Sequence, residues 1–345
     1  MNLDADDLPP NVIATIQGAR AQSTRNKYAI AWRVFQRWCS SRPGDVVPHQ
    51  ARVSVILTFL QSFLDDGKSF AAVKLNLAAI SACHVGFNGK TVWKHPLVRQ
   101  FMKGASRLHQ VSRTLVPPWD LTLVLDALTQ APFEPLEAVG LKHLTLKTAL
   151  LVALTSAKRV SDLHALSISP ECMQFNDDNS RVTIRPNPAF VPKNFLAPSA
   201  PVDLKAFHPP PFNSESEKRL NSLCPVRALR LYIDRTSPSR RGHSQLFVAW
   251  NPRTIGRPIT KVRLSQWIVE AIRIAYTSKG VQPPEVLRAH STRGVSTSWA
   301  LLKGVSIQEV CTAASWSSTS TFARYYNLDM AAPPVAHAVL AAATR

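Results

Sequence analysis

Apolar residues in the first third of the chain recur every three to four positions, and this helical spacing is the feature that most constrains the fold. Residues 23–39 show it clearly, with an apolar side made by Tyr28, Trp32, Phe35 and Cys39. Helices are also predicted over 51–68, 69–87 and 95–109, and no strand pattern occurs before residue 110. We therefore expect residues 21–110 to form an all-helical domain.

The rest of the chain combines helical segments with a short stretch of strand pattern. Residues 143–166 predict a buried helix, a polar break and a second helix, and 224–236 and 260–280 are also helical. Val182 and Ile184 alternate with polar residues, and residues 200–207 follow, which predicts a small hairpin or sheet. The expected fold class is mainly α with a small antiparallel β element.

Changes in composition indicate where the domains end. Residues 1–20 are expected to be a flexible leader, and Pro117–Pro118 marks a linker at 111–119. The second domain is then expected at 120–345. Its tail, residues 333–345, is small and apolar, and could dock on its own domain or on a neighbouring copy of the chain.

Positive charge indicates the class of partner. The 345 residues include 41 Lys and Arg against 22 Asp and Glu, a net charge of +19. Such a surface attracts polyanions, of which nucleic acid is the commonest, although acidic membranes or simple solubility are alternatives. On the predicted helix at 23–39, four basic residues lie outside the apolar stripe and are candidates for DNA binding, an ordinary solvated helix face being the alternative: Arg25, Lys27, Arg33 and Arg37.

Several other classes of protein are disfavoured. No run approaches the roughly 18–20 consecutive apolar residues that span a bilayer, and the acidic start MNLDADDLPP predicts neither a signal nor a transit peptide. The five Cys are widely spaced without a Cys-x-x-Cys pair, which predicts neither a disulfide framework nor a zinc site. With 12 Gly and no phosphate-binding loop, an NTPase is disfavoured. We expect a soluble intracellular protein without cofactor, metal or small-molecule substrate.

The last sixty residues contain side chains that suit phosphate chemistry. His290 and Arg293 are three residues apart, so on a helix both can reach one phosphate group. Further on, Tyr325 and Tyr326 fall in a predicted helix after Trp316. Neighbours on a helix point about 100° apart, so we expect one of the two tyrosines to face inward and the other to face elsewhere.

In this order, the segments resemble the tyrosine recombinase family, also called phage-integrase-type recombinases. SAKRVSDLHAL is similar to the first arginine box of that family, with Arg159 at the arginine position, and HSTR matches its His-x-x-Arg box. Trp316 takes the place where members carry His or Trp. Tyr325, nine residues later, falls on the nucleophile position, and Tyr326 is one place late.

The likeness has a narrower form and three departures. The first third is similar to the family's core-binding domain, and the phrases AHSTR, SWAL, AASWSS and YY are most similar to recombinases of DIRS- or Ngaro-type retrotransposons. Ala157 stands where the family often has Gly, Gly294 where His is frequent, and Ala314–Ser315 where Leu-Gly is common. These are packing positions, so they bear on the subfamily more than on the chemistry.

The resemblance implies DNA strand transfer without metal or ATP. Arg159 and Arg293 would clamp the non-bridging oxygens of a phosphodiester, because guanidinium is always charged and binds as a fork. Tyr325 would attack phosphorus and form a 3′-phosphotyrosyl link, while His290 would take its proton or bind the phosphate. Trp316 would donate its one N–H to an oxygen or serve in core packing.

Two further residues are expected to assist. Asp162 would hold His290 or an arginine in place. The family protonates the leaving 5′ oxygen with a lysine on a β-hairpin between the two arginine boxes; Lys193 is the candidate, and Lys205 competes with it.

The expected function is a site-specific DNA recombinase or integrase, serving mobile-element integration in the nucleus. As the resemblance implies, it would act on double-stranded DNA as a homo-tetramer. The alternatives are a catalytically silent DNA-binding regulator on the same fold and a type IB topoisomerase.

Overall fold

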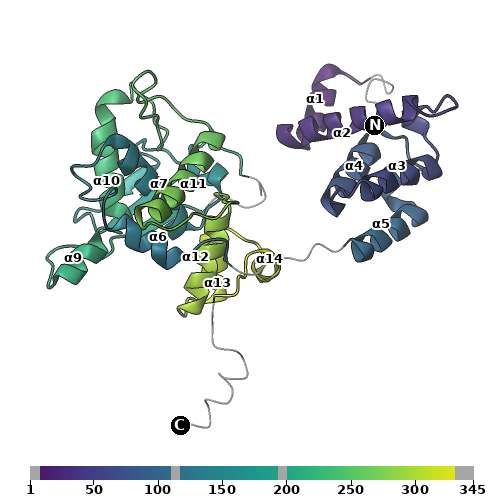
Figure 1. Ribbon diagram of the computed structural model, residues 1–345. Coiled ribbons are helices and arrows are strands. Elements are labelled where there is room, and N and C mark those ends of the chain that lie inside the picture. Colours follow the sequence, from purple (N-terminus) through teal and green to yellow (C-terminus); the bar gives the residue numbers. More distant parts are fainter. Residues whose placement is uncertain (1–7, 110–116, 193–199, 331–345) are drawn as a thin grey trace, which may run out of the picture. The chain divides into compact units, whose positions relative to one another are not determined.

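The computed structural model describes residues 8–109, 117–192 and 200–330 (Figure 1). The chain divides into two compact units, Met1–Thr114 and Leu115–Arg345, and each is described by itself. No helix in the described parts is long and apolar enough to cross a membrane.

The first unit is a bundle of helices around an aromatic and aliphatic core. In chain order its helices are α1 (Pro10–Gly18), α2 (Gln22–Ser40), η2 (Pro48–Gln50), α3 (Val53–Asp65), α4 (Phe70–Cys83), η3 (Val92–Lys94) and α5 (Pro96–Leu108). Helix α4 packs against α2 and α3 (Figure 1). Phe35 of α2 and Phe59 of α3 are buried, with ring centroids 4.9 Å apart. The helical spacing of this third therefore corresponds to the side that each helix buries.

Helix α1 differs from the expected flexible leader. Residues 10–18 form a helix that buries none of its side chains. Pro10 occupies its first turn, where the fixed φ of proline suits a helix and the missing N–H costs nothing. The leader predicted over 1–20 is thus wrong in this part, while residues 1–7 lie outside the described residues.

The second unit is built around one buried helix. Its helices are α6 (Leu121–Leu128), α7 (Leu141–Ser156), α8 (Val160–His164), α9 (Glu215–Asn221), α10 (Pro225–Thr236), η4 (Ser237–Ser239), α11 (Lys261–Ser278), α12 (Ser291–Leu302), α13 (Ile307–Ala313) and α14 (Thr319–Tyr325). Every residue of α7 from Leu144 to Leu154 is buried, as expected for a helix that is enclosed on all sides. Helices α10, α11 and α12 pack against it (Figure 1).

A small antiparallel sheet lies beside these helices. Its strands are β1 (Met173–Phe175), β2 (Arg181–Ile184) and β3 (Val202–Lys205), in the order β1-β2-β3. Val182 pairs with Leu204, and both side chains are buried. The fold class predicted from the sequence, mainly α with a small antiparallel β element, is confirmed. Strand β1 was not predicted, because three residues are too short to show an alternating pattern.

The predicted linker at 111–119 is described only from residue 117 onward. Trp119, at its end, is 3% exposed and belongs to the core of the second unit. Its indole N–H donates to Ser291 Oγ over 2.9 Å. Trp119 therefore anchors the start of the second unit, which corrects its assignment to a linker.

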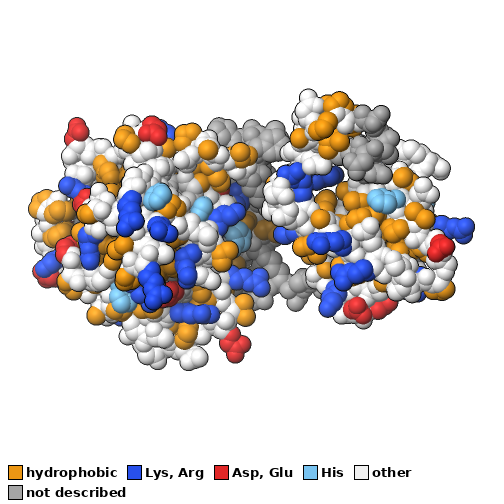
Figure 2. Space-filling view, turned by 90° about the horizontal axis from the view of Figure 1, so that it is seen from above, with side chains coloured by type: hydrophobic (Ala, Val, Ile, Leu, Met, Phe, Trp, Pro, Cys, Tyr) orange, Lys and Arg blue, Asp and Glu red, His pale blue; other side chains and the backbone are white. Residues whose placement is uncertain are grey.

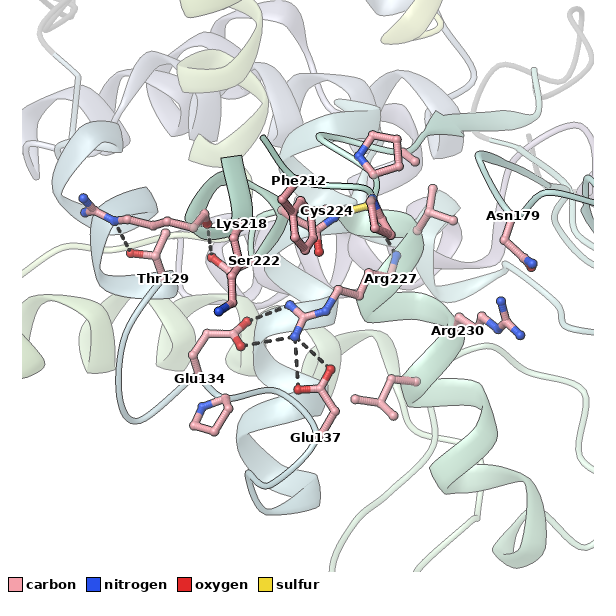
Figure 3. Close-up of a pocket in the computed structure, with 18 of the residues that line it drawn as sticks. Thr129, Glu134, Glu137, Asn179, Phe212, Lys218, Ser222, Cys224, Arg227 and Arg230 are labelled. Carbon is pink, nitrogen blue, oxygen red and sulfur yellow. Dashed lines mark hydrogen bonds and ion pairs between the residues drawn. The ribbon is translucent and has the colours of Figure 1, made fainter. Parts of the chain in front are cut away.

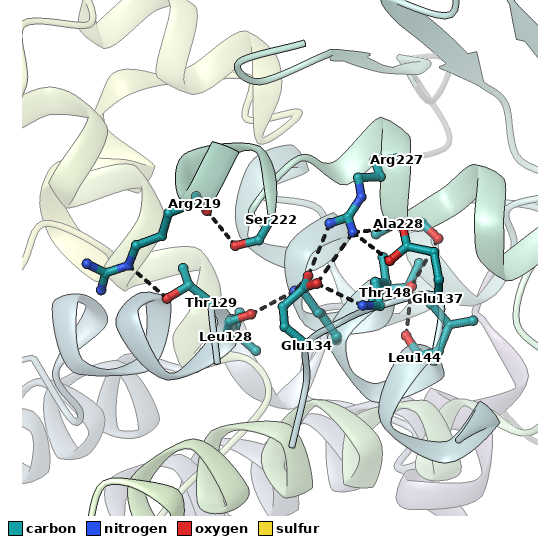
Figure 4. A network of polar contacts seen from close by, with 12 residues as sticks. Leu128, Thr129, Glu134, Glu137, Leu144, Thr148, Arg219, Ser222, Arg227 and Ala228 are labelled. Atoms are coloured by element: carbon teal, nitrogen blue, oxygen red, sulfur yellow. Dashed lines mark hydrogen bonds and ion pairs between the residues drawn. The ribbon is translucent and has the colours of Figure 1, made fainter. Parts of the chain in front are cut away.

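A charged network inside the second unit is fully paired (Figure 4). Lys147 of α7 is 0% exposed, and its Nζ donates to Glu134 Oε1 over 2.5 Å and to Leu128 O over 2.7 Å. Arg227 of α10 pairs with Glu134 over 3.1 Å and with Glu137 over 2.9 Å. Burial lowers the pKa of Lys147 to about 8, and Glu134 opposes this shift.

The same arginine and glutamates line a pocket of about 970 Å³ (Figure 3). Phe212 and Cys224 lie on another side of it. None of the site residues predicted from the sequence lines this pocket.

Candidate active site

Arg159 begins helix α8 immediately after a sharp turn. Ala157 ends α7 with φ 51° and ψ 21°, a left-handed conformation that suits Gly better than Ala. The Arg159 backbone N–H donates to Asp162 Oδ2 over 3.3 Å, and Arg159 Nη1 lies 4.0 Å from the same oxygen. Ser161 donates to the other oxygen of Asp162 over 3.2 Å. Asp162 thus contacts both the backbone and the side chain of Arg159.

Arg293 lies in the first turn of α12 and is 1% exposed. Its Nη2 donates to Ala314 O over 2.7 Å, but Nε and Nη1 have no acceptor among the described residues. Burial, aided by the positive charge of Arg159, lowers the pKa of Arg293 to about 10, and Tyr326 and Asp162 oppose the shift. Two guanidinium groups from distant parts of the chain therefore lie close together.

Trp316 and Tyr326 stack beside this arginine. Their ring centroids are 4.4 Å apart with an interplanar angle of 32°. The Arg293 guanidinium carbon lies 4.9 Å from the Trp316 ring centroid and 5.3 Å from that of Tyr326. Trp316 is 7% exposed, and its Nε1 also lacks an acceptor within the described residues. Three buried nitrogen atoms of Arg293 and Trp316 consequently have no acceptor in the part of the chain that the structure describes.

The tyrosine in this cluster is Tyr326. A hydrogen bond of 2.9 Å joins its phenol oxygen to His290 Nε2, and His290 immediately precedes α12. Tyr325, the last residue of α14, is instead 61% exposed. The structure therefore corrects the expectation that Tyr325 faces the cluster. As expected, one of the two tyrosines faces inward and the other does not.

The end of α14 explains this choice. Phe322 is 1% exposed and packs on Trp316 with ring centroids 5.8 Å apart. Tyr326 follows Phe322 by four residues, so it lies on the same side of the chain, and its N–H donates to Phe322 O over 2.8 Å. Tyr325 is rotated away from that side by about 100°.

Helix α12 holds the segment after α14 in place. The Ser298 hydroxyl, 3% exposed, donates to Tyr326 O over 2.8 Å and accepts from the Leu328 N–H over 2.9 Å. Gly294, one turn earlier, faces the same segment, and a Cβ there would make ordinary van der Waals contact with Leu328 Cδ1 at 3.4 Å and Tyr326 O at 3.6 Å. The sequence did not identify Ser298, since a serine inside a helix carries no signal of a contact 30 residues away.

Lys158 is a second residue that the sequence did not identify. It precedes Arg159, is 4% exposed, and donates from Nζ to Ser315 Oγ over 2.7 Å. Its place beside an arginine box was visible in the sequence, but its burial was not.

The cluster as a whole is suited to binding an anion. The positive charge comes from Lys158, Arg159 and Arg293. Within the described part of the chain, the carboxylate of Asp162 interacts electrostatically with Lys158 and Arg293. Buried donors without acceptors are costly unless a ligand supplies the acceptor. Phosphate oxygens accept strongly from guanidinium and indole N–H groups. The phenol of Tyr326 lies at the edge of this site.

The predicted lysines stand apart from the cluster. Lys193 lies outside the described residues. Lys205 is exposed on β3, where its Cα pairs with that of Arg181, and none of the contacts of the cluster given above involves it.

The basic residues predicted to bind DNA all lie on α2. Lys27, Arg33 and Arg37 are exposed, whereas Arg25 is half-buried and bonded to Gln17 and Gln22. On the faces visible in Figure 2, Lys and Arg side chains are more abundant than Asp and Glu on both units.

Comparison with known proteins identifies the fold. No protein-family model matches the sequence, and no curated protein matches it. Solved structures are similar to it, however. A XerH site-specific recombinase bound to palindromic difH in a post-cleavage complex has a TM-score of 0.58 at 16% identity, covering 92% of this chain and 78% of that one.

Two other structures are similar at the same level. The Tn1549 transposon integrase in complex with circular intermediate DNA has a TM-score of 0.57 at 14% identity, covering 94% of this chain and 95% of that one. A lambda integrase tetramer bound to a Holliday junction has a TM-score of 0.51 at 16% identity, covering 89% and 74%. The chain thus has the fold of the tyrosine recombinases and integrases.

Proposed function

We propose that this chain is a site-specific DNA recombinase or integrase that cleaves and rejoins DNA through a 3′-phosphotyrosyl intermediate, with Tyr326 as the nucleophile. The observation that carries the proposal is the cluster in which the Tyr326 phenol contacts His290 and its ring stacks on Trp316, beside buried donors of Arg293 that have no acceptor among the described residues. The shared fold supports it.

The proposed reaction exchanges one phosphate ester for another. The Tyr326 oxygen forms a bond to phosphorus while the bond from phosphorus to the 5′ oxygen breaks, and rejoining is the reverse. The phenolic proton passes to His290, whose Nε2 is 2.9 Å from the phenol oxygen. Arg159, Arg293 and the Trp316 N–H stabilise the charge that develops on the non-bridging oxygens. Lys193 remains our proposal for the group that protonates the leaving oxygen.

The biological setting is part of the same proposal. The net charge of +19 and the exposed basic residues of α2 favour double-stranded DNA as the partner. Strand exchange joins two duplexes, so we propose a homo-tetramer on DNA. The likeness to DIRS- or Ngaro-type elements in the sequence favours integration of a retrotransposon in the nucleus.

Covalent capture tests this function and identifies the DNA site in the same experiment. The protein is incubated with nicked duplexes that contain a randomised segment, denatured, and recovered with any DNA that is covalently attached. Sequencing of that DNA gives the site. We expect adducts with the wild-type protein and with Tyr325→Phe, and none with Tyr326→Phe, because the Tyr326 phenol contacts His290 and Tyr325 is 61% exposed.

The other outcomes separate the alternatives. Loss of the adduct in Tyr325→Phe but not in Tyr326→Phe would overturn the assignment of the nucleophile and leave the reaction class intact. Retained binding of duplexes with no adduct at any sequence would favour the silent regulator. Relaxation of supercoiled DNA by a monomer, without strand exchange, would favour a type IB topoisomerase.

A further inference from the structure

The buried lysines of the second unit differ in their partners. Lys147 pairs with Glu134 and donates to a backbone carbonyl (Figure 4 shows Glu134 and its other partner Arg227). Lys158 is also buried, yet within the described residues its Nζ forms a hydrogen bond to Ser315 and no ion pair with a carboxylate. A buried cation with no paired anion is costly, so the two lysines call for different explanations.

Lys158 and Arg293 hold neighbouring residues of one turn. Lys158 donates to Ser315 Oγ over 2.7 Å, and Arg293 donates to Ala314 O over 2.7 Å. Ser315 has φ 53°, a conformation that residues other than Gly rarely adopt. Trp316 follows directly and stacks on Tyr326. The position of Trp316 therefore depends on two cations from different parts of the second unit.

The electrostatic surroundings of Lys158 are those of the anion site. Burial lowers the pKa of Lys158, Asp162 opposes this shift, and the positive charges of Arg293 and Arg159 add to it. Three cations thus influence one another around a single carboxylate in the described part of the chain. An oxyanion bound by the two arginines would relieve their mutual repulsion.

We propose that Lys158 is a positioning residue of the anion site, holding the turn that presents Trp316 and adding a third positive charge behind the phosphate. The inference rests on the proposed function, because the phosphate is the ligand that the site would bind. The proposal also explains why Lys158 is buried without an ion pair to a carboxylate in the described residues. The positive charge of Lys158 would stabilise the protein when phosphate is bound and destabilise it when the site is empty.

Thermal unfolding with inorganic sulfate as the probe tests this proposal. The midpoint is measured with sulfate up to about 10 mM against chloride of equal ionic strength, which keeps screening constant. The variants are Lys158→Met, Lys158→Arg and, as a matched control, Lys147→Met. We expect sulfate to raise the midpoint of the wild-type protein through binding to the folded state.

The expected pattern distinguishes a site residue from a structural one. Lys158→Met should unfold at or above the wild-type temperature in chloride, because the unpaired buried charge is gone, and should bind sulfate about tenfold more weakly. Lys158→Arg retains the charge and should respond to sulfate as the wild type does. Lys147→Met should lower the midpoint, since it leaves Glu134 without its lysine, and should leave the sulfate response unchanged.

Each other result has a definite meaning. A wild-type protein that responds equally to sulfate and chloride would contradict the anion site, and with it the proposed function. A clear wild-type response that Lys158→Met fully retains would overturn the role of Lys158 alone. A Lys158→Met protein that unfolds far below the wild type in chloride would show that the lysine serves folding, which also overturns the proposal.

Discussion

Tyr325 and Tyr326 are neighbours in the chain, yet their side chains lie in different surroundings. Tyr326 contacts His290, Trp316 and Arg293, while Tyr325 is mostly exposed. The phenol of Tyr326 meets an arginine whose remaining donors point to no acceptor in the described residues. At the scale of single residues, the site is therefore defined by the buried N–H donors that have no acceptor in the described residues.

Arg293 is predicted to be irreplaceable even by lysine. Lys would keep the charge but lose the planar fork, and the bond to Ala314 O would compete with phosphate for one ammonium group. We expect Arg293→Lys to slow cleavage by on the order of 10²–10³. Single-turnover cleavage of a captured duplex measures this, with DNA affinity followed in parallel. A rate within about threefold of wild type would contradict the assigned clamp.

Trp316 is predicted to act through its N–H as well as its ring. Trp316→Phe keeps an aromatic ring against Tyr326 and removes the donor, and we expect cleavage to fall by about tenfold to a hundredfold. Trp316→His restores an N–H donor and should recover part of the rate. If Phe and His variants cleave equally, the role of Trp316 is packing.

Helix α12 connects the proposed nucleophile to the phosphate clamp. His290 lies at its start, Arg293 in its first turn, and Ser298 near its middle. Gly294 faces the segment after α14. Helix α12 thus places His290, Arg293 and the backbone of Tyr326, while Arg159 comes from the start of α8.

Ser298 is predicted to matter for both stability and rate. Ser298→Ala leaves Tyr326 O and the Leu328 N–H without their partner, and we expect the free energy of unfolding to fall by about 1–3 kcal/mol. Cleavage should slow while DNA affinity is retained. The matched control is Ser296→Ala, whose hydroxyl donates to Arg293 O of its own helix over 3.4 Å. Equal effects of the two substitutions would argue against a specific hold on Tyr326.

For the whole molecule, the buried Lys147 predicts a contribution to stability that depends on pH. Its pKa falls from 10.5 to about 8 on folding, so between these values the unfolded chain binds more protons. The free energy of unfolding should therefore rise with pH across this window, by on the order of 1 kcal/mol per pH unit from this group. Urea unfolding at several pH values measures it. The difference between wild type and Lys147→Met isolates the lysine from other groups, and a flat difference would contradict the shift.

The charge of the whole molecule predicts binding that depends strongly on salt. Phosphate contacts release counterions, so the logarithm of the DNA association constant should fall linearly with the logarithm of salt concentration. Arg33→Ala and Arg37→Ala should each reduce the slope by about one if each contacts a phosphate. Val262→Ala, an exposed uncharged change on α11, serves as the control. An unchanged slope would mean that DNA does not bind on the side of α2 that carries Arg33 and Arg37.

Features that depend on residues close together in the sequence were easier to predict than features that depend on distant residues. The helix at 23–39 and the buried helix of 143–166 were predicted because their spacing is local. The flexible leader was wrong over residues 10–18, which form a helix of nine residues that buries no side chain. Trp119 was assigned to a linker because the adjacent prolines obscured a core residue.

The sequence by itself predicted the fold class and supplied the candidates for the proposed chemistry: two arginines, a histidine, a tryptophan and a tyrosine pair at spacings that local helices preserve. Only the tertiary structure decided that Tyr326 faces the cluster, that Lys158 is buried beneath it, and that Ser298 holds the final segment. The reason is physical. Hydrogen bonds join residues as far apart as 172 positions, and no periodicity along the chain records such contacts.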